Sequence, residues 1–187
     1  MSDSIAAGAT YSPASRAFHW ASALFVIGAW TLGLLGDELP RGPMRHAGEF
    51  AHVLLGQFVL LLLVLRIVWR FVTPPPPAEP SPFGLPGELA SRLGQFAIYA
   101  LLFSVPIVGL VTLFHGGETL PLLGVYDIPS PWPRNRELKH YSKEIHELLA
   151  HMLIVIATLH AAAALAHHYF LRDGTLRRML PFLPSPR

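Results

Sequence analysis

The chain of 187 residues contains no cysteine. Without thiolates it cannot hold a Cys-ligated iron–sulfur cluster, attach a c-type haem through a Cys-x-x-Cys-His run, or form a disulfide. Histidine, of which the chain has 10, is therefore the strongest metal-binding side chain available.

Charged residues are scarce. They make up 14% of the chain, against 52% hydrophobic residues, whereas an ordinary soluble domain carries about 25% charged residues. The composition therefore indicates an integral membrane protein that lies in the lipid bilayer. The net charge is only +2 and the basic residues are scattered among apolar runs, so nothing favours nucleic-acid binding.

Four apolar stretches approach the roughly 20 residues needed to cross a bilayer. They predict an all-α, integral membrane four-helix bundle that forms one domain over residues 1–187, with helices at about 17–36, 51–72, 92–114 and 145–170. Successive prolines make residues 73–82 a stiff, extended connector. Residues 115–144 are expected to form a long outer loop that caps one end of the bundle.

The basic residues set the expected orientation, because an even number of helices places both termini on one side. Eight lie on the terminal side and six on the other. By the positive-inside rule, the N- and C-termini are predicted to be cytoplasmic.

Four histidines, His19, His52, His146 and His160, lie at or inside the ends of the apolar stretches, where an ionisable group is costly and usually functional. His52 and His146 each begin a helix on the outer side, and His19 begins one on the inner side. His160 follows His146 by fourteen residues, a rise of roughly 21 Å, which moves it to the inner half and returns it to within about 40° of the same face. Two pairs at matched depths, outer His52 with His146 and inner His19 with His160, are what two bis-histidine haems require.

A haem-free metal-binding or transport protein is the alternative. Zinc would usually need a third or fourth protein ligand around each pair, and the sequence offers none. His46, His115 and His140 fall in outer loops, and His151 is about 140° from His146 around the fourth helix. We do not expect these four histidines to bind iron.

Other residues suit a flat porphyrin between the helices. Gly56 follows His52 by one turn and four alanines follow His160, which allows close backbone approach. Arg66 and Arg70 lie near the His52 face but at the inner end, where they are placed to neutralise haem propionates or to meet a polar ligand.

Four motifs together resemble the bacterial cytochrome b561 family over nearly the whole chain. They are Arg16-Ala-Phe-His-Trp20, His52 with Gly56 and Arg66, Pro106-Ile-Val-Gly-Leu110, and His146-Glu147 with Leu159-His-Ala-Ala-Ala-Ala-Leu-Ala-His-His-Tyr-Phe170. The resemblance implies a bundle in the bacterial inner membrane with two non-covalent haems b, one held by His19 and His160 and the other by His52 and His146.

Within that family, the chain is most similar to the stand-alone diheme members that act as superoxide oxidases. This likeness implies that an electron is taken from superoxide at the periplasmic face, passed between the haems, and delivered to ubiquinone in the membrane. The histidine geometry by itself implies only transmembrane electron transfer. A second hypothesis is therefore a haem b membrane subunit that relays electrons between quinone and a separate periplasmic dehydrogenase or hydrogenase as redox partner.

Two groups of residues bear on these substrates. Arg134, Arg136, Lys139 and Lys143 precede His146 in the outer segment and could steer a small anion such as superoxide, although interleaved glutamates fit a solvated loop of mixed charge equally well. At the inner end, His167 lies within roughly 20° of the His160 face, with His168 beside it. Together with Arg66 and Arg70 they could bind and protonate a quinone, or they could instead anchor at the interface or pair with propionates.

Overall fold

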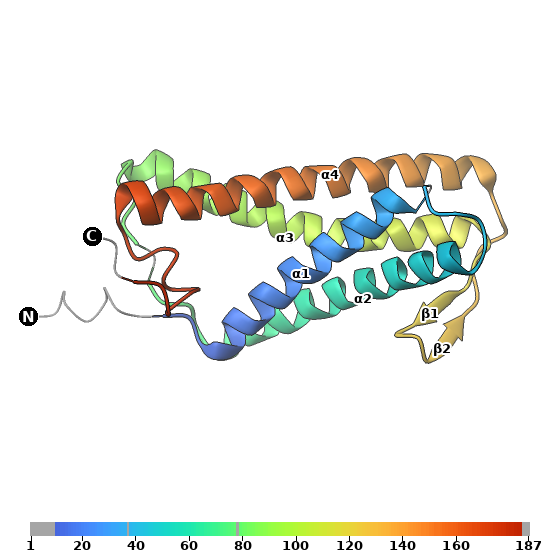
Figure 1. Ribbon diagram of the computed structural model, residues 1–187, viewed down its shortest axis with the longest axis horizontal. Coiled ribbons are helices and arrows are strands. Elements are labelled where there is room, and N and C mark those ends of the chain that lie inside the picture. The colour runs from blue at the N-terminus through green and yellow to red at the C-terminus, as the bar shows by residue number, and fades with distance from the viewer. Residues whose placement is uncertain (1–9, 37, 78, 185–187) are drawn as a thin grey trace, which may run out of the picture.

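The computed structural model describes residues 10–36, 38–77 and 79–184. Within these ranges, four helices are long and apolar enough to cross a membrane. The elements are α1 (Pro13–Leu35), α2 (Pro43–Val72), α3 (Gly84–His115), the strands β1 (Leu120–Leu122) and β2 (Tyr126–Ile128), α4 (Arg136–Ala166) and the π-helix η2 (His167–Leu171), which continues α4. The predicted all-α membrane four-helix bundle is confirmed (Figure 1).

The helices begin earlier than the apolar stretches suggest. Asn135 caps α4, because its side chain accepts hydrogen bonds from the backbone N–H groups of Glu137 and Leu138. Proline stands at the start of both α1 and α2, where its fixed φ suits the first helical turn. The prediction of a loop over residues 115–144 was therefore wrong at its C-terminal part, since hydropathy marks only the apolar portion of a helix and not its polar extension.

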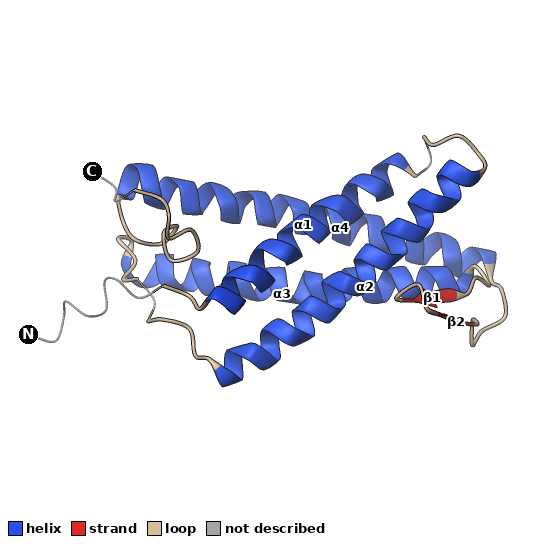
Figure 2. Ribbon diagram, turned by 60° about the horizontal axis from the view of Figure 1, so that its bottom comes forward, coloured by secondary structure: helices blue, strands red, loops and turns tan. Residues whose placement is uncertain are grey.

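The bundle is built from two helix pairs. In Figure 2 the pair α1–α2 crosses the pair α3–α4, and a small core joins them: Val59, Leu63, Leu101, Leu102 and Leu153. Large apolar side chains cover much of the outside, for example Phe71, Phe96 and Phe170, with exposed fractions of 85%, 73% and 84%. In a bilayer this surface contacts lipid, and the helices satisfy their own backbone hydrogen bonds.

The two ends of the bundle differ. At one, which we call the hairpin end, β1 and β2 pair antiparallel and dock on α2 through Gln57. Its side-chain amide donates to the Pro121 carbonyl and accepts from the Leu123 N–H, both at 2.9 Å. The hairpin thus satisfies a polar side chain of a membrane helix.

At the other end, which we call the tail end, residues 172–184 fold back after η2 (Figure 1). Arg178 of this tail forms an ion pair with Glu79 at 2.8 Å, and its carbonyl accepts from the Tyr11 N–H at 3.2 Å. The tail therefore ties the proline-rich connector to the segment that precedes α1.

Candidate functional site

The structure brings the four membrane histidines together in two pairs, one toward each end of the bundle. The rings of His19 (α1) and His160 (α4) have centres 6.4 Å apart and planes at 67°. Those of His52 (α2) and His146 (α4) have centres 5.9 Å apart and planes at 79°. Because imidazole nitrogens bind metals at about 2.0–2.1 Å, two rings on opposite sides of one ion have their centres roughly 6 Å apart. Each pair could therefore hold one iron between its two rings.

The arrangement does not suit a metal ion held by protein ligands alone. Within the described ranges, no group of three or more His, Cys, Asp or Glu side chains is placed to hold a metal. A porphyrin supplies four nitrogen ligands of its own, so two histidines complete its iron. The donor sets therefore fit a haem better than zinc.

Backbone carbonyls orient both histidines of the hairpin-end pair. Nδ1 of His52 lies 2.8 Å from the Ala29 carbonyl oxygen, and Nδ1 of His146 lies 2.9 Å from that of Val105. A carbonyl only accepts, so we assign the ring proton to Nδ1 in each case. The Nε2 lone pair is then available to a metal, which is the usual second-shell arrangement of a ligating histidine.

A glycine stands four residues after each of these carbonyls. A Cβ added at Gly33 would lie 3.2 Å from Cε1 of His52, and one at Gly109 would lie 3.0 Å from Cε1 of His146. Cα–Cβ bonds tilt toward the helix N-terminus, so a side chain at either position would lie over the carbonyl one turn earlier. Both glycines give a histidine ring access to a backbone oxygen.

A cavity adjoins the hairpin-end pair and is lined by residues of all four helices, among them Trp30, His52, Gly56, Pro106 and His146. A Cβ at Gly56 would have no atom within 4 Å, so this glycine, singled out from the sequence, does border open space. The buried indole nitrogen of Trp30 has no hydrogen-bond partner among the described residues. The cavity lies beside both histidines of the pair, and its walls are mainly apolar.

The tail-end pair has a different environment, since a cation lies beside it. Nη2 of Arg66 lies 3.4 Å from Nδ1 of His19, and the Arg66 guanidinium lies 5.2 Å from the centre of the Tyr99 ring. No carboxylate forms an ion pair with Arg66 in the part of the chain that the structure describes. Arg70, one turn further, is exposed. Of the two predicted arginines, Arg66 is thus the one that contacts a histidine of the pair.

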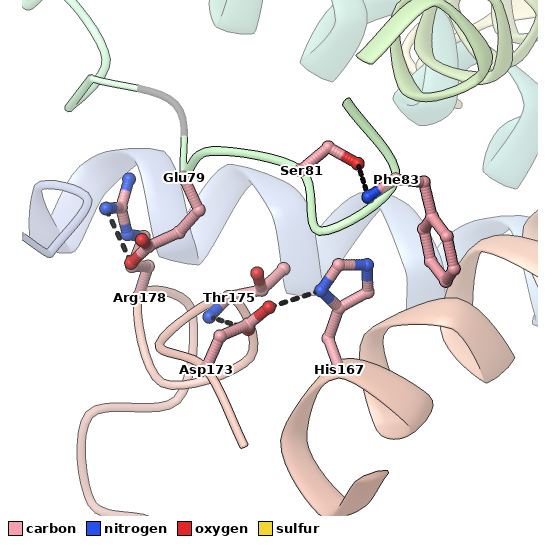
Figure 3. Close-up of polar contacts among 7 residues, drawn as sticks. All are labelled: Glu79, Ser81, Phe83, His167, Asp173, Thr175 and Arg178. Carbon is pink, nitrogen blue, oxygen red and sulfur yellow. Dashed lines mark hydrogen bonds and ion pairs between the residues drawn. The ribbon is translucent and has the colours of Figure 1, made fainter. Parts of the chain in front are cut away.

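His167 and His168 have different roles in the structure. Nδ1 of His167 donates a hydrogen bond to Oδ2 of Asp173 at 2.5 Å, and Oδ1 of Asp173 accepts from the Thr175 N–H at 2.9 Å (Figure 3). Burial alone would raise the pKa of Asp173, but the hydrogen bonds from His167 and Thr175 outweigh it and hold that pKa below its ordinary value. His168 is 6% exposed, and its Nδ1 has no partner within the described ranges.

The contact between His167 and Asp173 was not foreseen from the sequence. These residues belong to a π-helix and the tail that follows it, and a π-helix departs from the 100° spacing that placed His167 on the His160 face. The presence of an aspartate six residues after a histidine does not by itself predict that the two side chains are in contact. Only the fold of the tail brings the two together.

The four predicted cations of the hairpin end separate into two groups. Lys139 pairs with Glu118 at 2.5 Å and Lys143 with Glu147 at 3.5 Å. Arg134 and Arg136 are exposed, and neither has an ion pair within the described residues. The two lysines are neutralised by glutamates, as expected for a solvated segment of mixed charge. Of the four predicted cations, the two arginines therefore remain available to attract an anion.

The remaining histidines have partners of other kinds. His115 stacks on Trp132 with ring centres 4.9 Å apart, and His140 pairs with Glu144 at 3.3 Å. His46 lies 3.7 Å from Glu49, and Nδ1 of His151 contacts the Glu147 carbonyl of its own helix at 2.6 Å. None of these contacts brings a second histidine to the ring.

Comparison with known proteins gives a consistent result over almost the whole chain. Residues 10–182 match the family model described as prokaryotic cytochrome b561. The chain is 33% identical over 171 residues to cytochrome b561 homolog 2 of Escherichia coli K12, covering 91% of this chain and 90% of the relative. It is 35% identical over 171 residues to a probable superoxide oxidase, CybB, of Yersinia pestis, covering 91% and 96%. It is 26% identical over 175 residues to a cytochrome b562 of Cereibacter sphaeroides, covering 91% and 94%.

Proposed function

This chain belongs to the prokaryotic cytochrome b561 family, whose members are bacterial membrane proteins that transfer electrons through haem b, and we propose that it holds two such haems in series across the bilayer. The observation that carries the proposal is the presence of two histidine pairs in one bundle, with α4 contributing His146 to one and His160 to the other. When bound, each haem supplies an iron that accepts and releases one electron. The protein supplies ligands, spacing and electrostatics.

We propose superoxide as the electron donor. Support comes from the name of the Yersinia pestis relative, a probable superoxide oxidase, and from the two exposed arginines at the hairpin end. Positive charge near the entry point raises the local concentration of a small anion and speeds its association. By the excess of basic residues on the terminal side, the hairpin end faces the periplasm and both termini face the cytoplasm.

We propose ubiquinone as the acceptor, near the tail-end pair. Two superoxide ions release two electrons and become two molecules of oxygen, and one quinone takes up those electrons with two protons to become quinol. The candidate residues at this end are those expected from the sequence, Arg66, Arg70, His167 and His168, and the structure adds Asp173 as a contact of His167. The carboxylate of Asp173 is within hydrogen-bond reach of Nδ1 of His167, so the imidazole can take up a proton and offer it from Nε2.

The test is to supply superoxide to purified holoprotein together with a water-soluble ubiquinone analogue. The proposal expects haem reduction followed by quinol formation, with one quinol for every two superoxide ions consumed. If superoxide at modest flux leaves the haems oxidised while dithionite reduces them, the substrate assignment is wrong. The ligand assignment would be unaffected.

Arg134→Gln combined with Arg136→Gln should slow the bimolecular reduction by superoxide several-fold at low ionic strength. The reason is that no carboxylate within the described ranges pairs with either cation, so their field reaches solvent. The difference from the unaltered protein should shrink in high salt, because salt screens exposed charges. The matched control is Lys139→Gln combined with Glu118→Gln, which removes both members of an ion pair and leaves the net charge unchanged. Equal slowing in the control and the arginine variant would contradict specific steering by the arginines.

The second candidate is a haem b subunit for a separate periplasmic redox enzyme. One observation favours it: the hairpin exposes apolar side chains at the end of the bundle, with Val125 and Tyr126 exposed by 89% and 67%. Such residues outside the membrane can dock a partner protein. Dependence of quinone reduction on a co-purifying dehydrogenase or hydrogenase would support this candidate over direct superoxide oxidation.

A further inference from the structure

We propose that the pocket between the start of α1 and the C-terminal tail binds the headgroup of one anionic phospholipid, and that Arg16 pairs with its phosphate. No residue of either histidine pair lines this pocket. The inference therefore goes beyond the proposed electron transfer and does not depend on the identity of the electron donor or acceptor.

The pocket lies where the tail folds back against the first turns of α1 (Figure 1). Its volume is about 240 Å³, far more than the roughly 10–15 Å³ that a single water needs. Pro13, Arg16, Ala17 and Trp20 form the α1 wall, with the spacing of one helix face, and residues 179–182 of the tail form the other wall. The pocket thus has room for a polar headgroup between two segments far apart in the chain.

Arg16 is the charged residue that lines this pocket. Its Nε is buried and has no hydrogen-bond partner among the described residues, and no carboxylate forms an ion pair with Arg16 in those ranges. Arg178 of the tail, by contrast, is neutralised by Glu79 at 2.8 Å. A guanidinium has only donors and stays charged, and a buried charge without a partner is costly. A phosphate supplies both the opposite charge and several acceptor oxygens.

The surroundings of the pocket favour a lipid over a free phosphate ion. Trp20 is 43% exposed, and Leu24 and Ile27 follow on the same face of α1 with exposed fractions of 67% and 57%. These side chains form an apolar track that leads from the pocket toward the middle of the bilayer, where an acyl chain can lie against them. Phe182 is 79% exposed on the tail side. A headgroup in the pocket would therefore have an apolar surface beside it for its chains.

The position and charge of the pocket favour an anionic lipid. By the excess of basic residues, the tail end is predicted to face the cytoplasm, where the leaflet carries anionic lipids and basic pockets beside membrane helices bind their headgroups. A zwitterionic lipid brings its own ammonium group, which weakens the attraction to Arg16. A quinone is neutral, so it would leave the charge of Arg16 uncompensated.

A bound lipid should also hold the tail against α1. Nε1 of Trp20 lies 3.5 Å from the Met179 carbonyl oxygen, and the Tyr11 N–H donates to the Arg178 carbonyl at 3.2 Å. A headgroup in the pocket contacts both walls, so it adds to these links between the two segments. A ligand that binds only the folded-back tail stabilises that arrangement.

The test is native mass spectrometry of detergent-purified holoprotein with added dioleoylphosphatidylglycerol. We expect one phosphatidylglycerol to bind more tightly than any other, and dioleoylphosphatidylcholine to bind several-fold more weakly. Arg16→Gln should weaken the tight binding by about tenfold, because a charge-assisted pair is lost, and Arg16→Lys should weaken it less. Arg92→Gln, which removes an exposed arginine on α3 outside the pocket, should have no effect. Hydrogen exchange in residues 172–184 should slow on lipid binding in the unaltered protein and not in Arg16→Gln.

A second variant keeps the test informative if Arg16→Gln does not assemble. Phe182→Asp places a negative charge in the tail wall and should also weaken phosphatidylglycerol binding. The inference is overturned if neither variant weakens that binding, or if phosphatidylcholine binds as tightly. Displacement of phosphatidylglycerol by inorganic phosphate at the same concentration would contradict it too, since the site would then take a free ion. Loss of haem from Arg16→Gln with unchanged lipid binding would assign the guanidinium to a haem propionate instead.

Discussion

Replacing His52 or His146 with alanine is expected to halve the haem content of the purified protein and to leave the other haem in place. Replacing His19 or His160 should have the same effect on the other site. The physical reason is that the two pairs share no residue. Within each pair, the ring centres are separated by about the distance that two histidines on one iron require. The proposed electron transfer from superoxide to quinone should be lost in all four variants, because the loss of either haem interrupts the series.

The measurement is the ratio of haem to protein, combined with the reduced-minus-oxidised spectrum of each variant. His140→Ala is the control, since His140 is exposed and pairs with Glu144 rather than with another histidine. It should keep both haems. A variant in either pair that retains full haem content, or loses both haems while the helical content is unchanged, would show that the pairing is incorrect.

Gly109→Val is expected to eliminate the hairpin-end haem without a change to any ligand. A Cβ at this position would already lie 3.0 Å from Cε1 and 3.2 Å from Nδ1 of His146, and valine adds two methyl groups. The ring must then leave the Val105 carbonyl, so Nε2 no longer points where the iron requires it. Additional carbons in a packed interior typically reduce the free energy of unfolding by about 1–3 kcal/mol. At this position, the side chain that has to move is the His146 ring.

The effect should be graded and local. Gly109→Ala should weaken haem retention less than Gly109→Val, and Gly33→Val should act on the same site through His52. Gly94→Val is the matched control on the same helix, because a Cβ there meets no atom within 4 Å. Haem content and the spectrum of the remaining haem report the result. Equal haem loss in the Gly94 and Gly109 variants would mean that glycine acts through helix flexibility and not through the histidine contact.

Much of the fold follows from the sequence because a membrane restricts the choices. An apolar stretch of about 20 residues has to cross the bilayer as a helix, so four such stretches predict the bundle that the structure shows. The depth of each histidine then follows from helix direction and the fixed rise per residue. His146 and His160 fall at two depths on one helix for this reason, and the structure places each beside the expected partner.

Other features depend on contacts between segments far apart in the chain. Gly33 and Gly109 acquire a role only when His52 and His146 from neighbouring helices reach them. Asp173 becomes important because the tail folds back on His167. The pairing of Lys139 with Glu118 depends on the turn after α3, which no periodicity specifies. The sequence therefore identified the ligand candidates, whereas the residues that orient and tune them required the structure.

The most direct test of the account is the haem content of the purified chain, measured together with its reduced-minus-oxidised absorption spectrum and a redox titration. The account predicts two haems b per chain, a sharp b-type α band, and two one-electron steps. A single haem per chain, or no b-type band at all, would contradict the proposal of two histidine-ligated haems in series.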